Sequence, residues 1–252
     1  MIKVWKAIRI IWVIAGISFL VWMVYSSQSR GVPKSMLQSD QSITVSETSG
    51  DISFIPVKDK RETGFVFYPG AMIDPRSYVP MAYRLAENGY SVYIVKLPFR
   101  SALLSGQEEK VMEYTRQIFD TNPFVQRWVV GGHSRGGAIA SRFAFNNIDR
   151  ISGLILIGTS HPKDNTFDLS TSGLVVMKIY ATQDGLASVS EIMETRVFLP
   201  DDTTWIEVEG GNHAQFGYYG TQLGDNQADI SREEQQMITI SAILSMLNDV
   251  DK

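Results

Sequence analysis

One five-residue segment, Gly132-His133-Ser134-Arg135-Gly136, constrains the fold of this chain more than any other. The β-branched run before it predicts a buried strand, and the small residues after it predict the start of a helix. A strand that turns this sharply into a helix holds its central residue, Ser134, in a strained backbone conformation. A Cβ atom at Gly132 or Gly136 would collide with the neighbouring strand or helix. The segment therefore predicts a nucleophile elbow; the alternative is a glycine-rich turn with a packing role only.

Strands and helices alternate along the rest of the chain. Strands are predicted at 43–45, 52–55, 64–68, 91–95, 127–130, 153–157, 174–180 and 203–207, and helices at 76–88, 108–119, 137–145, 188–194 and 231–248. Near-continuous apolar strands separated by helices indicate a mostly parallel sheet with helices on both faces. Residues 159–172 are too few for a helical cap, so we expect no large cap domain. In the closing helix, Met237, Ile240, Ile243 and Leu247 are predicted to face inward.

The composition excludes several kinds of site. The chain has 252 residues and no cysteine, which excludes disulfides, a thiol nucleophile, a thiolate metal site and a lipid-modified cysteine. Three histidines argue against a histidine-built metal site. A net charge of −4 argues against a nucleic-acid-binding surface. We therefore expect no metal, no cofactor and no nucleic-acid partner.

The N-terminal segment predicts a membrane anchor. An uncharged run from Ile10 to Tyr25 follows three basic residues, Lys3, Lys6 and Arg9. Together with the apolar residues just before it, this run approaches the roughly 20 residues of a spanning helix, so residues 8–25 are expected to contact the membrane. A signal peptide that is cleaved, followed by secretion, is the alternative. The basic residues before the run outnumber those behind it, which predicts a cytoplasmic N-terminus and an extracytoplasmic domain.

Three parts of the chain follow from these patterns. Residues 1–25 are the expected transmembrane anchor, and residues 26–42, rich in Ser, Gln, Gly, Pro and Asp, are an expected flexible tether. Residues 43–252 are the expected folded α/β domain. The sequence indicates no oligomeric state.

Ser134 needs a partner, because a serine hydroxyl at its ordinary pKa is a poor nucleophile without a base within hydrogen-bond reach. His213 lies on a glycine-rich loop directly after the last predicted strand, where a base can reach back across the strand ends. His161 also lies downstream of Ser134, although a simple loop role accounts for it. His133 is expected to pack beneath the turn. We therefore predict His213 as the general base.

The expected acid is Asp184, which stands at the carboxyl end of a predicted strand in a turn closed by Gly185. A carboxylate there would accept the Nδ1–H of His213, fix the tautomer of the ring and stabilise the imidazolium formed in the reaction. A plain Asp-Gly turn is the alternative interpretation. The other downstream candidates, none of which directly follows a strand on the expected side, are Asp164, Asp168, Asp201 and Asp202.

Two backbone N–H groups are expected to stabilise the negative charge that develops during the reaction. One belongs to Arg135, the residue after the nucleophile, at the N-terminus of the elbow helix. The other belongs to Ala71, because Gly70 is expected to turn the backbone so that the Ala71 N–H points at the site. Met72 is the next choice. An ordinary type II turn at Pro69-Gly70 is the alternative.

Five segments resemble a known family. In chain order they are Phe67–Gly70, Asp74–Tyr78, Gly131–Gly137, Tyr180–Gly185 and Gly210–Gly220. Over residues 43–250 the chain is similar to α/β-hydrolases, and more narrowly to the small bacterial dienelactone-hydrolase-like group called alpha/beta hydrolase family 5, many of whose members carry a membrane-anchored N-terminus. The resemblance implies the α/β-hydrolase fold and a triad of Ser134, Asp184 and His213. Dienelactone hydrolases use cysteine where this chain has Ser134, so lactone cleavage does not carry over.

The expected function is hydrolysis of carboxylic esters, or of related thioesters or amides, through an acyl-enzyme. The expected substrate is a small-molecule or surface-bound acyl compound, because the site is predicted to be shallow and open. Candidate walls with no assigned binding role are Phe99, Phe216, Tyr218 and Tyr219, and the Arg135 side chain is expected to be solvated. Acyl transfer on the same triad and a non-catalytic, surface-anchored binding module are the alternatives.

Overall fold

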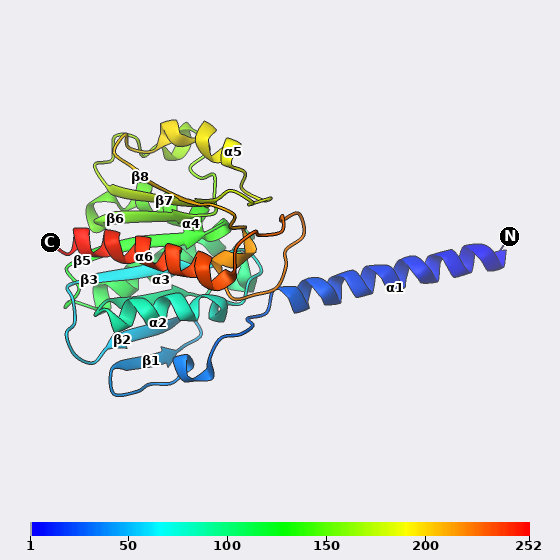
Figure 1. Cartoon of the computed structure of the whole chain (residues 1–252), viewed down its shortest axis with the longest axis horizontal. Helices are drawn as coiled ribbons and strands as arrows, with labels where there is room; N and C mark the ends of the chain where they lie inside the picture. Colours follow the sequence, from blue (N-terminus) through cyan, green and yellow to red (C-terminus); the bar gives the residue numbers. More distant parts are fainter. Residues whose placement is uncertain (1) are drawn as a thin grey trace.

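An eight-stranded sheet forms the centre of this computed structural model, which describes residues 2–252 (Figure 1). The strands are β1 (Ile43–Glu47), β2 (Asp51–Pro56), β3 (Thr63–Tyr68), β4 (Ser91–Val95), β5 (Arg127–His133), β6 (Gly153–Ile157), β7 (Val175–Ala181) and β8 (Thr204–Val208). Their order across the sheet is β1-β2-β4-β3-β5-β6-β7-β8. Strands β3 to β8 pair in parallel, and β1 and β2 add an antiparallel edge. The prediction of a mostly parallel sheet is confirmed.

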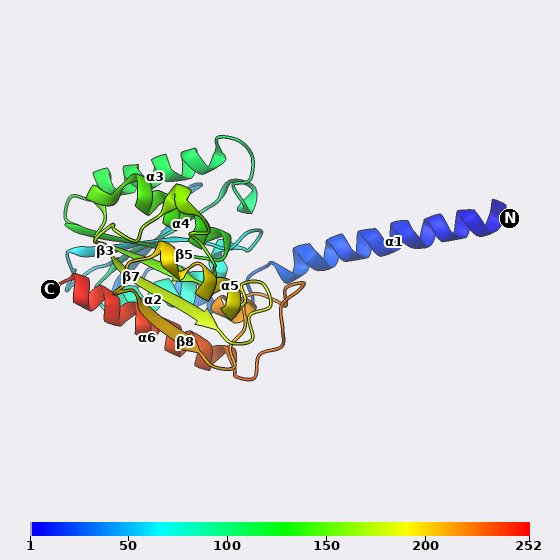
Figure 2. The same ribbon diagram turned by 90° about the horizontal axis from the view of Figure 1, so that it is seen from above.

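Helices cover both faces of this sheet. Besides α1 (Ile2–Ser26), they are α2 (Val79–Glu87), α3 (Gln107–Thr121), α4 (Arg135–Asn146), α5 (Val189–Glu194) and α6 (Arg232–Val250). Helices α2 and α6 lie on one side of the sheet and α3 and α4 on the other (Figure 2). The short helix α5 packs beside β7 and β8. Each face therefore has its own apolar core.

Strand β5 shows why the central strands are apolar along their whole length. Successive side chains of a strand point to opposite faces. Val129 packs into the core under α2 and α6, and Val130 packs into the core under α3 and α4. Between β6 and β7, the described residues form only one short 3₁₀ turn, Asn165–Phe167, so the structure has no large cap.

Two predicted helices differ from the structure in detail. The predicted helix at 76–88 is divided into a 3₁₀ turn, Pro75–Tyr78, followed by α2. Pro80 has no N–H to donate to the carbonyl four residues earlier, so the α-helical pattern cannot extend back through this point. The prediction that Met237 faces inward is wrong, because 63% of its surface is exposed.

The first turns of α6 instead bury polar side chains. Gln235, Gln236 and Thr239 are buried, whereas Ile243 and Leu247 pack into the core as predicted. The two glutamines donate hydrogen bonds to backbone carbonyls of the loop after β8, which explains why polar residues face inward here.

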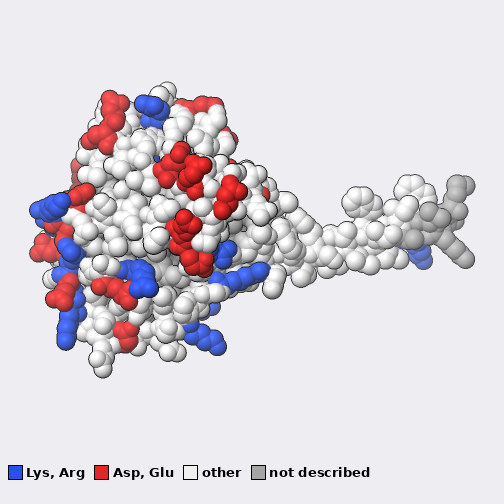
Figure 3. Space-filling model, in the orientation of Figure 1, with Lys and Arg blue, Asp and Glu red and all other residues white. Residues whose placement is uncertain are grey.

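Helix α1 projects from the end of the domain where the parallel strands finish (Figure 1). Its segment Ile8–Ser26 has a mean hydropathy of 2.0, and all of its residues except Ser26 are exposed. By length and composition it is a candidate membrane span or signal sequence. The half of α1 nearest the domain carries no charged side chain, as the white surface in Figure 3 shows.

The segment expected to be a flexible tether, residues 26–42, makes several contacts with the domain. Backbone hydrogen bonds join Ser26 to Gly220, Ser27 to Asp74 and Arg30 to Tyr218. Apolar side chains of the segment also pack against the core under α2 and α6; these are Val32, Met36 and Leu37. The composition of this segment does not reveal these contacts, because the polar ones are made by backbone atoms. The division into anchor, tether and domain stays a prediction.

Lys178 is a charged residue in the middle of β7 that is completely buried. Its Nζ donates a hydrogen bond of 2.8 Å to the backbone carbonyl of His161. Burial, and secondarily the charge of Lys163, lowers the pKa of Lys178 from 10.5 to about 7.

Candidate active site

Ser134 occupies the junction between β5 and α4. Its backbone has φ 55° and ψ −119°, a conformation that is rare for a residue with a side chain. Its N–H donates to the carbonyl of Ile157 at 2.9 Å, which ties the junction to the end of the neighbouring strand β6. The strained turn that the sequence predicts at Ser134 is present.

The two flanking glycines leave room for backbone contacts that any larger residue would block. A Cβ on Gly132 would lie 2.3 Å from the backbone carbonyl atoms of Gly136. A Cβ on Gly136 would lie 1.9 Å from the carbonyl oxygen of Tyr68, at the end of β3. Both distances are far below van der Waals contact. The elbow therefore depends on close packing of β5, α4 and β3.

Asp184 and His213 form a buried pair. Asp184 Oδ2 lies 2.8 Å from His213 Nδ1, and both side chains are almost completely buried. Asp184 Oδ1 accepts the N–H groups of Leu186 and Ala187, at 2.8 and 2.7 Å. With its carboxylate fixed, Asp184 selects the tautomer in which Nδ1 carries the proton, leaving Nε2 as an acceptor.

The free nitrogen of His213 has no hydrogen-bond partner in the described part of the chain. Nε2 is buried, and no hydrogen bond joins it to Ser134 Oγ. Catalytic hydrogen bonds are often long in the absence of substrate and tighten when substrate binds. The His213 ring centroid lies 4.4 Å from that of His133, the residue before Ser134. The Asp184–His213 pair thus sits against the elbow.

Asp225 is a site residue that the sequence analysis did not single out. Its carboxylate accepts the N–H groups of Gly185, His213 and Ala214, at 3.2, 3.2 and 2.8 Å. It therefore joins the loop of Asp184 to the loop of His213. No local pattern marks Asp225, because the three N–H groups that it joins lie 11 to 40 positions away.

A second support for the loop of His213 comes from α6. Gln235 Oε1 accepts the N–H of Asn212 at 3.0 Å, and Gln235 Nε2 donates to the carbonyl of the same residue at 2.7 Å. This pair of bonds fixes the peptide directly before His213. The polar side of α6 faces inward because it holds the loop of His213.

Two backbone N–H groups near the elbow have no partner in the described residues. Arg135 is the first residue of α4, a position whose N–H has no acceptor within the helix. The Ala71 N–H makes no hydrogen bond either, whereas the N–H of Met72 donates to the carbonyl of Arg100 at 2.6 Å. Of the two residues considered for the second oxyanion donor, Ala71 is therefore the one with a free group.

The turn that presents Ala71 differs from the expected one. The left-handed residue is Met72, with φ 65°, and not Gly70. The N–H of Ile73 donates to the carbonyl of Gly70 at 3.3 Å, so the turn spans residues 70–73. Gly70 is closely packed: a Cβ there would lie 3.1 Å from His133 Nδ1 and 3.2 Å from Tyr78 Oη, which are tight contacts.

His133 is buried beneath the turn and connects the elbow to this loop. Tyr78 Oη accepts the N–H of Gly70 at 3.1 Å and lies 2.8 Å from His133 Nδ1. The Tyr78 hydroxyl therefore links the Gly70 backbone to the His133 ring. Burial lowers the pKa of His133 well below 6.5, and the charge of His213 adds to this effect, so the His133 ring is neutral. The structural role expected for His133 agrees with this arrangement.

The other candidate histidine lies in a different environment. His161 Nδ1 is 3.2 Å from Thr159 Oγ1, and burial lowers the pKa of His161 to about 4. The alternative aspartates serve their own loops: Asp164 accepts the N–H of Thr166, and Asp168 accepts that of Ser170. Asp201 and Asp202 are exposed, and within residues 2–252 none of these four carboxylates hydrogen-bonds a histidine.

Several side chains near the site differ from expectation. The prediction that the Arg135 side chain is solvated is wrong, since it is only 19% exposed and pairs with Glu108 at 2.7 Å. Glu108 also pairs with Arg142 at 2.8 Å, so its carboxylate joins α3 to α4. Of the candidate walls, Phe216 and Tyr219 are core residues, Tyr218 is half-buried and Phe99 is exposed. Residues 2–252 contain no cluster of three or more acidic, histidine or cysteine side chains that could hold a metal ion.

Comparison with known proteins gives a family match. A model of the Alpha/beta hydrolase family matches residues 64–237, which include Ser134, Asp184 and His213. No curated protein matches the chain.

Solved structures share the fold at low sequence identity. A predicted CIB-like hydrolase from Thermoplasma acidophilum has a TM-score of 0.61 and 16% identity, covering 81% of this chain and 97% of that one. A soluble variant of monoglyceride lipase from Saccharomyces cerevisiae, in complex with a substrate analog, has a TM-score of 0.64 and 10% identity, covering 85% and 96%. Est1E from Butyrivibrio proteoclasticus has a TM-score of 0.58 and 12% identity, covering 83% and 99%.

Proposed function

Because the chain belongs to the alpha/beta hydrolase family, we propose that it is a serine hydrolase that cleaves carboxylic esters through an acyl-enzyme. The observation that carries the proposal is the buried Asp184–His213 hydrogen bond, placed against a strained elbow at Ser134. Similar structures described as a monoglyceride lipase and as a ferulic acid esterase support ester substrates.

In this proposal Ser134 Oγ attacks the ester carbonyl while its proton passes to His213 Nε2. The carbonyl oxygen becomes an oxyanion that accepts the N–H groups of Arg135 and Ala71. The C–O bond of the ester then breaks, and the leaving alcohol takes the proton from His213. Water repeats the sequence on the acyl-enzyme, which releases the carboxylic acid and returns the proton to Ser134.

The proposal is tested by covalent labelling of the full-length protein, solubilised in detergent, with a fluorophosphonate. We expect a stoichiometric adduct on Ser134, located by peptide mass spectrometry, together with hydrolysis of p-nitrophenyl acetate. Both should disappear in Ser134→Ala, and labelling should be lost in His213→Ala. Thermal unfolding like that of the unchanged protein would show that each variant is folded. A folded protein that is neither labelled nor active would overturn the proposal in favour of a binding module.

We also propose that α1 is an uncleaved membrane anchor with a cytoplasmic N-terminus. Supporting this, Ser26 and Ser27 at its end are buried against the domain and hydrogen-bond with it. The mature protein should therefore retain residues before Ser26 and resist extraction from membranes by alkaline carbonate. A mature protein whose N-terminal residue is Ser26 or a later residue would contradict this assignment.

A further inference from the structure

The base of α1 is attached to the same edge of the sheet as the candidate active site. Ser26 accepts the N–H of Gly220, in the loop after His213, and its hydroxyl donates to the carbonyl of Thr221. Ser27 accepts the N–H of Asp74, in the loop after β3. These loops follow the carboxyl ends of β8 and β3, the edge at which Ser134 lies. Helix α1 therefore emerges beside the site and not on the far side of the domain.

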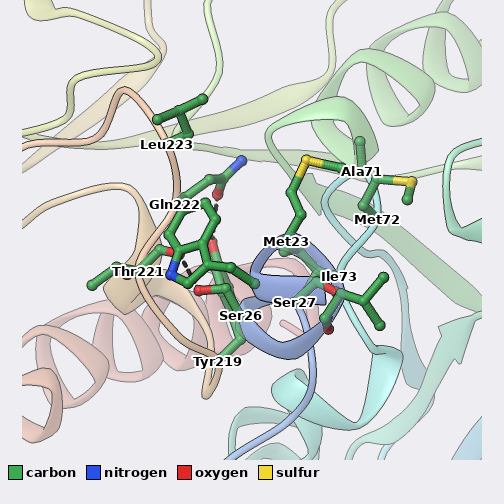
Figure 4. A pocket seen from close by; sticks show the side chains of 12 residues that line it. Met23, Ser26, Ser27, Ala71, Met72, Ile73, Tyr219, Thr221, Gln222 and Leu223 are labelled. Carbon is green, nitrogen blue, oxygen red and sulfur yellow. Dashed lines mark hydrogen bonds between the residues drawn. The ribbon is translucent and has the colours of Figure 1, made fainter. Parts of the chain in front are cut away.

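A pocket of about 270 Å³ lies between the end of α1 and these two loops (Figure 4). Its walls are largely apolar: Trp22 and Met23 come from α1, Ile73 from the loop after β3, and Leu223 from the loop after β8. Figure 4 shows Met23 extending from the helix toward Ala71. An apolar pocket of this kind suits a hydrocarbon chain better than a polar group.

The pocket meets the candidate site at Ala71. Ser134, Asp184 and His213 do not line the pocket, but Ala71 and Met72 do. Under the proposed function, the Ala71 N–H binds the oxygen of the reacting carbonyl. A chain attached to that carbonyl can then continue past Ala71 into the pocket.

Resting on the proposed function, we propose that the substrate is an acyl ester of a membrane lipid, whose acyl chain passes from the bilayer along α1 into this pocket. The continuity of the pocket with the candidate membrane span Ile8–Ser26 indicates the bilayer as the source. Helix α1 is then a wall of the acyl site as well as an anchor.

Exposed apolar side chains on the surrounding loops support a bilayer-facing edge. Isolated exposed apolar residues are common, but several here belong to loops at the same edge of the sheet. They are Met72, Phe99, Leu103, Leu104 and Leu223, each at least 47% exposed. The loop of Phe99 also reaches the base of α1, because Arg100 contacts both Gln28 and Asp74.

The reaction is a hydrolysis and needs no reagent other than water. The ester C–O bond of the lipid breaks after attack by Ser134, the glycerol hydroxyl leaves with the proton from His213, and water then releases the fatty acid.

The test uses full-length protein reconstituted in phosphatidylcholine vesicles with isotopically labelled dioleoylglycerol. The labelled lipid is placed either in the vesicles that carry the protein or in a separate, protein-free population. Release of labelled oleate and of oleate from phosphatidylcholine is measured by mass spectrometry, and p-nitrophenyl acetate is assayed in parallel. We expect release to be at least about tenfold faster when lipid and protein share a vesicle.

The outcomes separate this inference from the proposed function. Equal rates with lipid in the same and in separate vesicles would show that the ester arrives through water and would overturn the inference. Hydrolysis of the acetate ester without release of oleate from either lipid would also overturn it, while leaving the serine hydrolase intact. Loss of acetate hydrolysis and of fluorophosphonate labelling would remove both.

A matched pair of variants on α1 tests the pocket directly. Met23→Trp fills the pocket, whereas Val21→Trp introduces the same side chain at a position that is 62% exposed and does not line the pocket. Met23→Trp should lower oleate release at least tenfold more than it lowers acetate hydrolysis, and Val21→Trp should leave both rates within twofold. Equal effects of the two variants would overturn the inference.

A second pocket variant guards against misfolding at position 23. Leu223 is 66% exposed, so Leu223→Asp adds a charge to the pocket from the loop side at little cost to folding. It should also reduce oleate release more than acetate hydrolysis. An unchanged ratio of the two rates in this variant would contradict the pocket assignment.

Discussion

The nucleophile side of the candidate site and its acid–base side are held by different interactions. At the elbow, Ser134 is positioned by backbone packing that requires glycine at 132 and 136. On the other side, Asp184 and His213 are positioned by hydrogen bonds from side chains elsewhere in the chain, above all Asp225 and Gln235.

The difference determines what each side tolerates. Close backbone packing has no substitute, so a single added methyl group is enough to displace the elbow. The loops of Asp184 and His213 are each held by several hydrogen bonds. When one bond is lost, the remaining bonds still hold the loop in part. We therefore expect a large loss of activity when either glycine is substituted, and a smaller loss when Asp225 or Gln235 is substituted. Substitution of the candidate catalytic residues should lower activity most.

The largest expected effect is that of Asp184→Asn. The amide can donate to His213 Nδ1 and so favours the tautomer whose Nε2 carries the proton, which cannot accept one from Ser134. The kcat for p-nitrophenyl acetate should fall about 10⁴-fold, as for other triads. Asp201→Asn, an exposed alternative, should change kcat less than twofold. A decrease of less than threefold in Asp184→Asn would place the acid elsewhere.

Gly136→Ala is expected to be the next most damaging. Its Cβ would lie 1.9 Å from the Tyr68 carbonyl oxygen, so the elbow must move away from β3. A shift of about 1 Å in the nucleophile can cost about 10²-fold in rate, and we expect a lower Tm as well. Gly16→Ala is the control, because a Cβ there has nothing within 4 Å. Normal activity in Gly136→Ala would show that the position of Ser134 does not depend on this close packing.

Asp225→Asn tests the hydrogen bonds that join the loops of Asp184 and His213. The amide keeps one acceptor oxygen but loses the second, so Gly185, His213 and Ala214 can no longer all be bound. Because Asp225 positions His213 and does not touch substrate, kcat should fall about tenfold with KM nearly unchanged. Asp229→Asn, on the same loop, should have little effect. A selective rise in KM would instead assign Asp225 to substrate binding.

The smallest effect is expected for Tyr78→Phe, which removes the hydroxyl that links His133 of the elbow to the loop of Gly70 and Ala71. The Gly70 N–H and His133 Nδ1 would lose their partner, at a cost of about 1–3 kcal/mol in the free energy of unfolding. The kcat should fall about threefold, since the backbone packing of the elbow remains. Urea titration and kinetics of this variant and of a control, Tyr25→Phe, whose side chain is exposed, would measure both effects. No change in either quantity would show that the link is dispensable.

The same difference explains how much the sequence predicts. The elbow is local, so five consecutive residues were enough to predict Ser134 and its strained turn. The positions of Asp184 and His213 followed from the ends of predicted strands, and the structure brings the two together. Asp225 could not be predicted, because its partners are distant backbone groups that leave no pattern.

Periodicity and composition did not predict the contacts that are made by polar groups. Met237 fits a helical apolar stripe, yet the buried side of α6 at that turn is polar because Gln235 holds the loop of His213. The composition of residues 26–42 likewise concealed their backbone contacts with the domain. The alternation of strands and helices along the chain and the covering of both faces of the sheet were predictable, since they depend mainly on apolar burial.

The buried lysine of β7 makes the stability of the fold a function of pH. Lys178 has a pKa of about 7 in the folded chain and about 10.5 when exposed by unfolding. Between these values the unfolded chain binds more protons, so stability should rise with pH, by up to about 1.4 kcal/mol per unit. Below pH 7 both states are protonated and the dependence ends. Lys178→Met should abolish the slope in urea titrations at pH 7.5, 8.5 and 9.5; an unchanged slope would show that Lys178 stays charged in the core.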